Sequence, residues 1–281
     1  MTDYFLDAKI IFRDPSLWGI GIALVFGTFW IVLLAPRQAA RPTFWVMFLL
    51  GALAFVPAIA WVQSPLQTLL GQGLTRLWTM EQLQERVLLA VVPQILIGGL
   101  VQEGLKFIPL AIWFFAVRRG VAGPKSSLIL GAALGAGFAI VEGQWVLNTL
   151  FAQGFTWETL QIGWDAYLPF IERFFIMGFG VAAGGLMAWG LARRLGWQSY
   201  LVASVLHGAI NYGAVLYQLG RLSVIQVEVG IAVFSTAFFC LIAFLRWRKS
   251  DGDLPGPVVE AAPPAGQSDL PAATQTGVTN G

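Results

Sequence analysis

Apolar residues gather in seven long stretches along this chain, and short polar segments separate them. A helix needs about 20 consecutive apolar residues to cross the hydrocarbon core of a membrane. Each stretch is close to this length or longer, so each predicts a transmembrane helix. The predicted spans are residues 17–35, 43–62, 87–117, 126–150, 173–192, 199–219 and 224–245. The pattern therefore predicts an all-α fold, a polytopic membrane helix bundle of about seven transmembrane helices.

The third span is longer than one crossing requires, and it contains Pro93 and Pro109. A proline inside a helix removes a backbone hydrogen bond and kinks the axis, while a long apolar helix can tilt to fit the bilayer. We expect one tilted or kinked helix over residues 87–117. The alternative is a re-entrant piece followed by a separate span.

The composition supports a membrane protein. The 281 residues are 57% hydrophobic and 11% charged, whereas an average soluble domain has about 25% charged residues. The 17 Lys and Arg nearly balance the 15 Asp and Glu, so no basic surface favours a nucleic-acid partner. The lone cysteine, Cys240, gives no disulfide to infer. The expected surroundings are the lipid bilayer, and the oligomeric state stays open.

The basic residues predict the orientation. Lys and Arg concentrate in the first, third and fifth connections and directly after the last span. Basic residues in short loops mark the cytoplasmic side, so we expect the N-terminus outside, the C-terminus in the cytoplasm and a multi-pass protein of the plasma membrane. Residues 1–249 then form one membrane-embedded domain. Residues 250–281 are rich in Pro, Gly, Ala and Thr, which predicts a disordered cytoplasmic tail.

Residues that can carry a charge lie deep inside three of the predicted spans. Glu103 and Lys106 lie in the third, Glu142 in the fourth and His207 in the sixth. A charged residue at the bilayer centre costs about 2.5–3.5 kcal/mol on insertion scales, so such residues usually face partners, water or substrate. With Asn211, they all lie about 8–16 residues from the cytoplasmic helix ends, near the midplane. The sequence therefore predicts that polar groups from three helices converge at one depth.

The spacing within each helix agrees with this prediction. Residues three or four apart lie on one helical face. The pairs with this spacing are Glu103 with Lys106, Phe138 with Glu142, and His207 with Asn211. Small residues also recur at intervals of four in the fourth and fifth spans, which predicts close backbone packing of these helices. These are Gly131 with Gly135, and Gly180 with Gly184.

Three short motifs carry these residues in order: QEGLK at 102–106, FAIVE at 138–142 and HGAIN at 207–211. Together they resemble the PrsW family of intramembrane proteases, a branch of the group that includes CAAX prenyl endopeptidases. The resemblance covers residues 87–219 and implies an intramembrane endopeptidase that cleaves membrane-anchored proteins. The family normally has Glu at the first position of the first motif, where this chain has Gln102.

An amide hydrolase needs a base for water, donors for the oxyanion and a proton for the leaving amine. Glu103 is the preferred base, because the charge of Lys106 one turn away favours the carboxylate. Glu142 has no cation on its own helix and is the candidate acid. His207 and Asn211 are the candidate oxyanion donors. The candidate supporting residues are Gln102, Lys106 and Phe138.

A single divalent metal, such as zinc, is the alternative to a site without a cofactor. Glu103, Glu142 and His207 could supply three ligands and leave a fourth position for water. Zinc sites usually contain more nitrogen or sulfur than one histidine provides, so we favour the metal-free site.

Two other functions remain open. Gln102 cannot act as a base, which favours a catalytically inactive relative that binds or regulates membrane segments. Carboxylates and a histidine at the midplane also build proton relays, which is typical of a proton-coupled carrier. No inverted repeat of interrupted helices supports the carrier.

Overall fold

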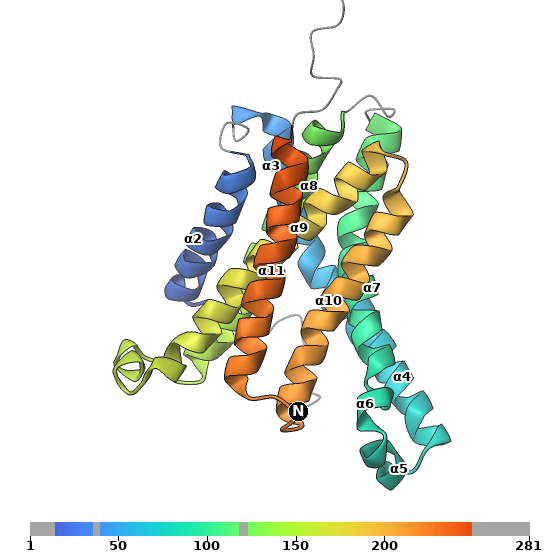
Figure 1. Ribbon diagram of the computed structural model, residues 1–281, viewed down its shortest axis with the longest axis vertical. Coiled ribbons are helices and arrows are strands. Elements are labelled where there is room, and N and C mark those ends of the chain that lie inside the picture. The colour runs from blue at the N-terminus through green and yellow to red at the C-terminus, as the bar shows by residue number, and fades with distance from the viewer. Residues whose placement is uncertain (1–14, 36–39, 118–122, 249–281) are drawn as a thin grey trace, which may run out of the picture. The chain divides into compact units, whose positions relative to one another are not determined.

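The computed structural model describes residues 15–35, 40–117 and 123–248, which fold into helices with no strand among them (Figure 1). The longer helices are α2 (Leu17–Leu34), α3 (Pro42–Val56), α4 (Ser64–Leu77), α7 (Val92–Ile112), α8 (Pro124–Ala152), α9 (Leu168–Ala192), α10 (Gly196–Gln218) and α11 (Val224–Trp247). The shorter ones are α5 (Met80–Glu85), α6 (Val87–Ala90), the π-helices η2 (Pro57–Gln63) and η3 (Trp113–Val117), and the 3₁₀-helices η4 (Trp157–Gln161) and η5 (Trp164–Tyr167).

Within the described ranges, seven helical stretches are long and apolar enough to cross a membrane. They are Leu17–Leu34, Pro42–Leu77, Val87–Ala116, Pro124–Ala152, Trp164–Ala192, Gly196–Gln218 and Val224–Trp247. The predicted all-α bundle of seven spans is thus confirmed. The orientation of the termini stays a prediction. The tail predicted over residues 250–281 lies outside the described residues.

The second span is longer than predicted. We expected it to end at residue 62, but the helix continues through η2 and α4 to Leu77. The apolar pattern stops where Gln63, Ser64 and Gln67 begin, yet polar residues can continue a helix. Pro65 lies inside this continuous helix, two residues after the last residue of η2. It removes one backbone donor, and the adjoining π-helical turns are one way in which a helix adjusts to such a loss. The prediction followed hydropathy, which marks the end of the apolar segment but not of the helix.

The third span contains one main helix, α7, preceded by the short α6. Pro93 lies in the first turn of α7, while Pro109 lies inside it. The helix continues past Pro109 to Ile112 and then widens into the π-helix η3. Proline removes one backbone donor, and a change to π geometry is one way in which a helix adjusts nearby. The structure thus has one helical stretch over Val87–Ala116, made of α6, α7 and η3, as the prediction of a single helix over residues 87–117 requires.

Helices α8 and α9 form the centre of the bundle. In their most apolar windows 78% and 72% of the residues are buried, against 28–39% in the other five spans. A Cβ atom added to Gly131 would collide with the backbone oxygen of Gly184, and one added to Gly135 with that of Gly180. The two helices therefore pack backbone to backbone, as the glycine spacing predicts. Around this pair, α2 and α3 pack on α8, and α10 packs on α9 and α7.

The packing of α3 on α8 predicts a specific sensitivity at Gly51. A Cβ atom there would collide with the backbone oxygen of Leu134, so Gly51→Ala must push the helices apart. Overpacking of this kind typically costs about 1–3 kcal/mol. We expect a clearly lower unfolding temperature in detergent. Gly21→Ala is the control, because a Cβ atom there meets nothing within 4 Å. Equal unfolding temperatures for the two variants would contradict the packing.

Candidate functional site

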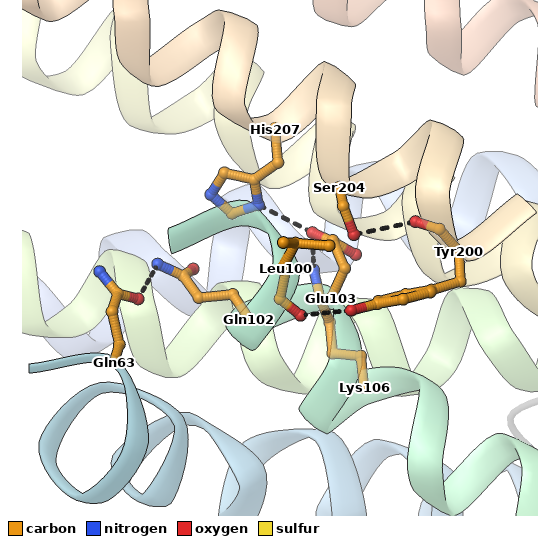
Figure 2. Close-up of polar contacts among 8 residues, drawn as sticks. All are labelled: Gln63, Leu100, Gln102, Glu103, Lys106, Tyr200, Ser204 and His207. Carbon is orange, nitrogen blue, oxygen red and sulfur yellow. Dashed lines mark hydrogen bonds and ion pairs between the residues drawn. The ribbon is translucent and has the colours of Figure 1, made fainter. Parts of the chain in front are cut away.

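The crossing of α7 and α10 places the candidate site. A Cβ atom added to Gly99 on α7 would collide with the backbone oxygen of Ser204 on α10, so the two helices touch at this point. Glu103 lies one turn after Gly99, and His207 lies about one turn after Ser204. The close approach therefore brings these two side chains together, as Figure 2 shows.

The carboxylate of Glu103 is the centre of the site. Its Oε1 accepts a hydrogen bond from Lys106 Nζ at 2.6 Å and lies 2.8 Å from His207 Nδ1. The side chain of Glu103 is 0% exposed and that of Lys106 is 2% exposed. The other carboxylate oxygen, Oε2, is buried and has no hydrogen-bond partner among the described residues. Glu103 thus holds two partners with one oxygen and leaves the other available.

Lys106 has a second partner besides Glu103. Its Nζ lies 4.8 Å from the centre of the Phe138 ring on α8, within the range of a cation–π interaction. The ring of Phe138 packs edge-on against Phe55 of α3, with the centres 5.3 Å apart. Phe138, predicted as a supporting residue, therefore lies directly against the ammonium group. Its position also links the charged pair to α3 and α8.

His207 is held from two sides. Its Nδ1 faces Glu103, and its ring meets Phe179 of α9 edge-on at 5.7 Å. Phe179 packs in turn on Phe234 and Phe238 of α11. The Nε2 atom makes no hydrogen bond with any described residue. The ring orientation is therefore fixed while one nitrogen remains open to a ligand.

The structure does not join Glu142 and Asn211 to this cluster. Both side chains are half-buried, and neither makes a hydrogen bond or ion pair within the part of the chain that the structure describes. Depth and helical face predicted that they would converge with Glu103. Their roles therefore stay predictions.

Gln102, predicted as a supporting residue, contacts a residue outside the three motifs. Its Nε2 donates to Oε1 of Gln63 in η2 at 2.9 Å (Figure 2). Its own Oε1 is buried and has no partner among the described residues. Sequence reasoning missed Gln63, which lies just beyond the apolar segment.

Tyr200 is a second neighbour that the motifs did not indicate. Its hydroxyl donates to the backbone oxygen of Leu100 at 3.0 Å, and its ring packs on Phe107 with centres 5.4 Å apart. Both contacts connect α10 to α7, one before and one after Glu103 in the sequence, and Figure 2 shows the one with Leu100. Tyr200 therefore helps to hold the two helices in register.

The donors around Glu103 do not fit a catalytic zinc site. Such a site has three protein ligands, and no group of three His, Cys, Asp or Glu side chains able to hold a metal forms among the described residues. Of the predicted set, only Glu103 and His207 meet. The ammonium group of Lys106 also lies 2.6 Å from Glu103 Oε1, where it would repel a divalent cation.

The fold and the site define a class: a multi-pass α-helical membrane protein with a carboxylate, an ammonium and an imidazole buried between its helices. The family model described as PrsW family intramembrane metalloprotease matches residues 39–243, a range that contains the whole cluster. The chain therefore belongs to the PrsW family. No curated protein and no solved structure matches the chain significantly.

Family membership agrees with the sequence motifs. The PrsW family is a family of intramembrane proteases, which implies membrane-protein substrates and a lipid environment. Its description as a metalloprotease is compatible with a single divalent metal. The chain is thus an integral, multi-pass membrane protein of a protease family.

The buried ion pair can be tested by a double-mutant cycle. Lys106→Met leaves the Glu103 carboxylate buried without its ammonium partner, and such a loss typically costs about 3–5 kcal/mol. We expect a lower unfolding temperature in detergent. Adding Glu103→Gln should restore much of the stability, because a neutral amide tolerates burial better than an unpaired carboxylate. If the single and double variants unfold at the same temperature, the two charges are not coupled.

Proposed function

We propose that this protein is an intramembrane endopeptidase that hydrolyses peptide bonds of membrane-anchored proteins, with Glu103 as the base that activates water. One observation carries the proposal: a fully buried carboxylate holds Lys106 and His207 with one oxygen and keeps the other unpaired. An unpaired buried acceptor costs about 1–3 kcal/mol. A water molecule that donates to Oε2 would satisfy this oxygen and place the nucleophile.

The proposed hydrolysis begins with the attack of water on the substrate. The water oxygen bonds to the scissile carbonyl carbon while a water proton passes to Glu103 Oε2. The carbonyl oxygen takes up the negative charge. Once Glu103 is neutral, the positive charge of Lys106 is no longer compensated by the carboxylate, so it stabilises the oxyanion nearby. The C–N bond then breaks, and the leaving nitrogen takes a proton from Glu103 or from Glu142.

The hydrogen bond between His207 and Glu103 limits what the imidazole can do. A neutral ring that donates its Nδ1–H to the carboxylate carries a lone pair on Nε2. It can then accept a proton, but it donates to an oxyanion only as an imidazolium. Asn211 lies one turn further on α10 and offers a neutral N–H donor in either state. We therefore assign the oxyanion to Asn211 first and give His207 the task of orienting Glu103.

A binding protein without activity is the second candidate function. The observation that favours it is Gln102, whose amide is tied to Gln63 and cannot replace a carboxylate as a base. On this alternative the polar cluster only stabilises a groove for membrane segments. The two functions differ in whether any substrate is cleaved.

Glu103→Gln tests the proposed base. The change keeps the size of the side chain but removes the proton acceptor, so cleavage of a membrane-anchored reporter in proteoliposomes should fall to the background. Glu228→Gln is the matched control, because it makes the same change on α11, away from the cluster, and should keep most activity. Cleavage by Glu103→Gln at the wild-type rate would remove Glu103 from the mechanism. No cleavage by wild type, with activity in Gln102→Glu, would support the binding protein.

The same purified preparations test the metal. We expect zinc well below one equivalent in the wild type, because the donors around Glu103 do not form a three-ligand site. The metal content of His207→Ala should then be the same. Near-stoichiometric zinc that disappears in His207→Ala would show a metal site instead and would overturn the metal-free proposal.

A further inference from the structure

Four glutamine side chains form a hydrogen-bonded row that begins beside Glu103. Gln102 Nε2 donates to Gln63 Oε1 at 2.9 Å, and Gln63 Nε2 donates to Gln67 Oε1 at 3.4 Å. Gln67 Nε2 then donates to the backbone oxygen of Gln94 at 2.9 Å, and Gln94 Nε2 to that of Gln67 at 3.1 Å. We call these four residues the glutamine row. It lies between α7 on one side and η2 with α4 on the other.

The π-helix η2 sets the position of Gln63. Gln63 is the last residue of η2, and a π-helical segment turns later side chains away from the direction that an α-helix would give them. Such segments occur frequently at functional sites. On the facing helix, a Cβ atom at Gly98 would lie 3.5 Å from Gln63 Nε2 and 3.8 Å from Gln67 Nε2. A larger side chain there would fill the space beside both amides.

The row has unused hydrogen-bonding capacity. Gln102 is 6% exposed, and its Oε1 has no donor among the described residues. Each side-chain amide offers two N–H donors and two acceptor lone pairs, and each glutamine here uses one donor. A buried unpaired acceptor is rare in native proteins and calls for an explanation. A ligand that both donates and accepts hydrogen bonds would complete the row.

The length of the row matches a short peptide. Gln94 and Gln102 are separated by about 12 Å along the axis of α7, at 1.5 Å per residue. An extended chain rises about 3.3 Å per residue, so about three or four residues fit beside the row. The exposure decreases from half-buried Gln67 and Gln94 to buried Gln102, which lies next to Glu103 in the chain.

We propose that the glutamine row binds the backbone of an unwound substrate segment on one side of the bond presented to Glu103. The proposal rests on the proposed function. A peptide bond must leave its helix before water can attack it, and each backbone group then left unpaired in the membrane costs several kcal/mol. Side-chain amides carry the same donor and acceptor as a peptide bond. Recognition of this kind selects substrates whose helices unwind easily. It does not depend on a particular sequence of side chains.

The experiment uses two synthetic single-span peptides as probes. They have the same flanks and length, but one has a central Gly-Pro pair that breaks the helix and the other has Ala-Leu. Binding to the full-length protein in lipid nanodiscs is measured by fluorescence anisotropy. We expect wild type to prefer the Gly-Pro peptide about tenfold, because one or two extra amide hydrogen bonds supply this difference. The same preference in Glu103→Gln would show that binding does not need hydrolysis.

Gln63→Met and Gln67→Met remove the amides while keeping the side-chain length. Either should abolish the preference, whereas Gln72→Met, on an exposed position of α4, should keep it. Gln63→Asn serves if Gln63→Met does not fold, and its shorter amide should weaken the preference. Equal binding of both peptides by wild type would overturn the proposal. An unchanged preference in Gln63→Met, together with a lower unfolding temperature, would also overturn the proposal, because this result is expected if the row only stabilises the fold.

These results are independent of the proposed function. A preference for the Gly-Pro peptide in a wild type that cleaves nothing would support the row and refute the protease. Cleavage by a wild type that shows no preference would support the protease and refute the row.

Discussion

A carboxylate and an ammonium group lie together inside an apolar helical bundle, and both are almost completely buried. Removing two charges from water is so costly that their attraction compensates only when further contacts assist. Here the contacts come from other helices: His207 on α10 reaches the carboxylate, and Phe138 on α8 faces the ammonium group. The charged pair is therefore stable only where α7, α8 and α10 meet.

This requirement also explains why the site can be reactive. The contacts with Lys106 and His207 occupy only Oε1 of Glu103, so Oε2 remains for water. The carboxylate is shielded from solvent, and electrostatic effects are larger in a protein interior than in water. A carboxylate, an ammonium group and an imidazole thus lie within one hydrogen-bonded cluster, in which we propose that the carboxylate acts as the base and the ammonium group offsets the developing oxyanion. The glutamine row starts at Gln102, the residue before Glu103, and leads toward α4, where we propose that an unwound peptide binds.

Hydropathy and helical spacing predicted much of this arrangement. The seven spans, the contact of Glu103 with Lys106 and the close packing of α8 on α9 all follow from residues near each other in the sequence. The approach of His207 to Glu103 also agreed with the depth argument. Glu142 and Asn211 make no hydrogen bond or ion pair with them in the part of the chain that the structure describes. Depth fixes the height of a side chain but not the rotation of its helix, so it could not predict such contacts.

The role of Gln63 could not be predicted for a different reason. The apolar segment ends before it, whereas the helix continues as η2 and α4. The partner of Gln102 therefore lay in a stretch that hydropathy assigns to a connection. No pattern in the sequence indicates a π-helix at this point. The face of the helix on which the Gln63 side chain lies could therefore be seen only in the structure.

The central claim is that Glu103 activates water rather than attacking the substrate itself. Heavy-oxygen water tests the difference, because a carboxylate that forms a mixed anhydride with the substrate takes up solvent oxygen whenever water opens that anhydride at the carboxylate carbon. The measurement follows many turnovers of a membrane-anchored reporter in such water, with mass spectrometry of the new product terminus and of the enzyme peptide that contains Glu103. The account predicts heavy oxygen in the product and none in Glu103. Heavy oxygen in the Glu103 carboxylate would contradict it.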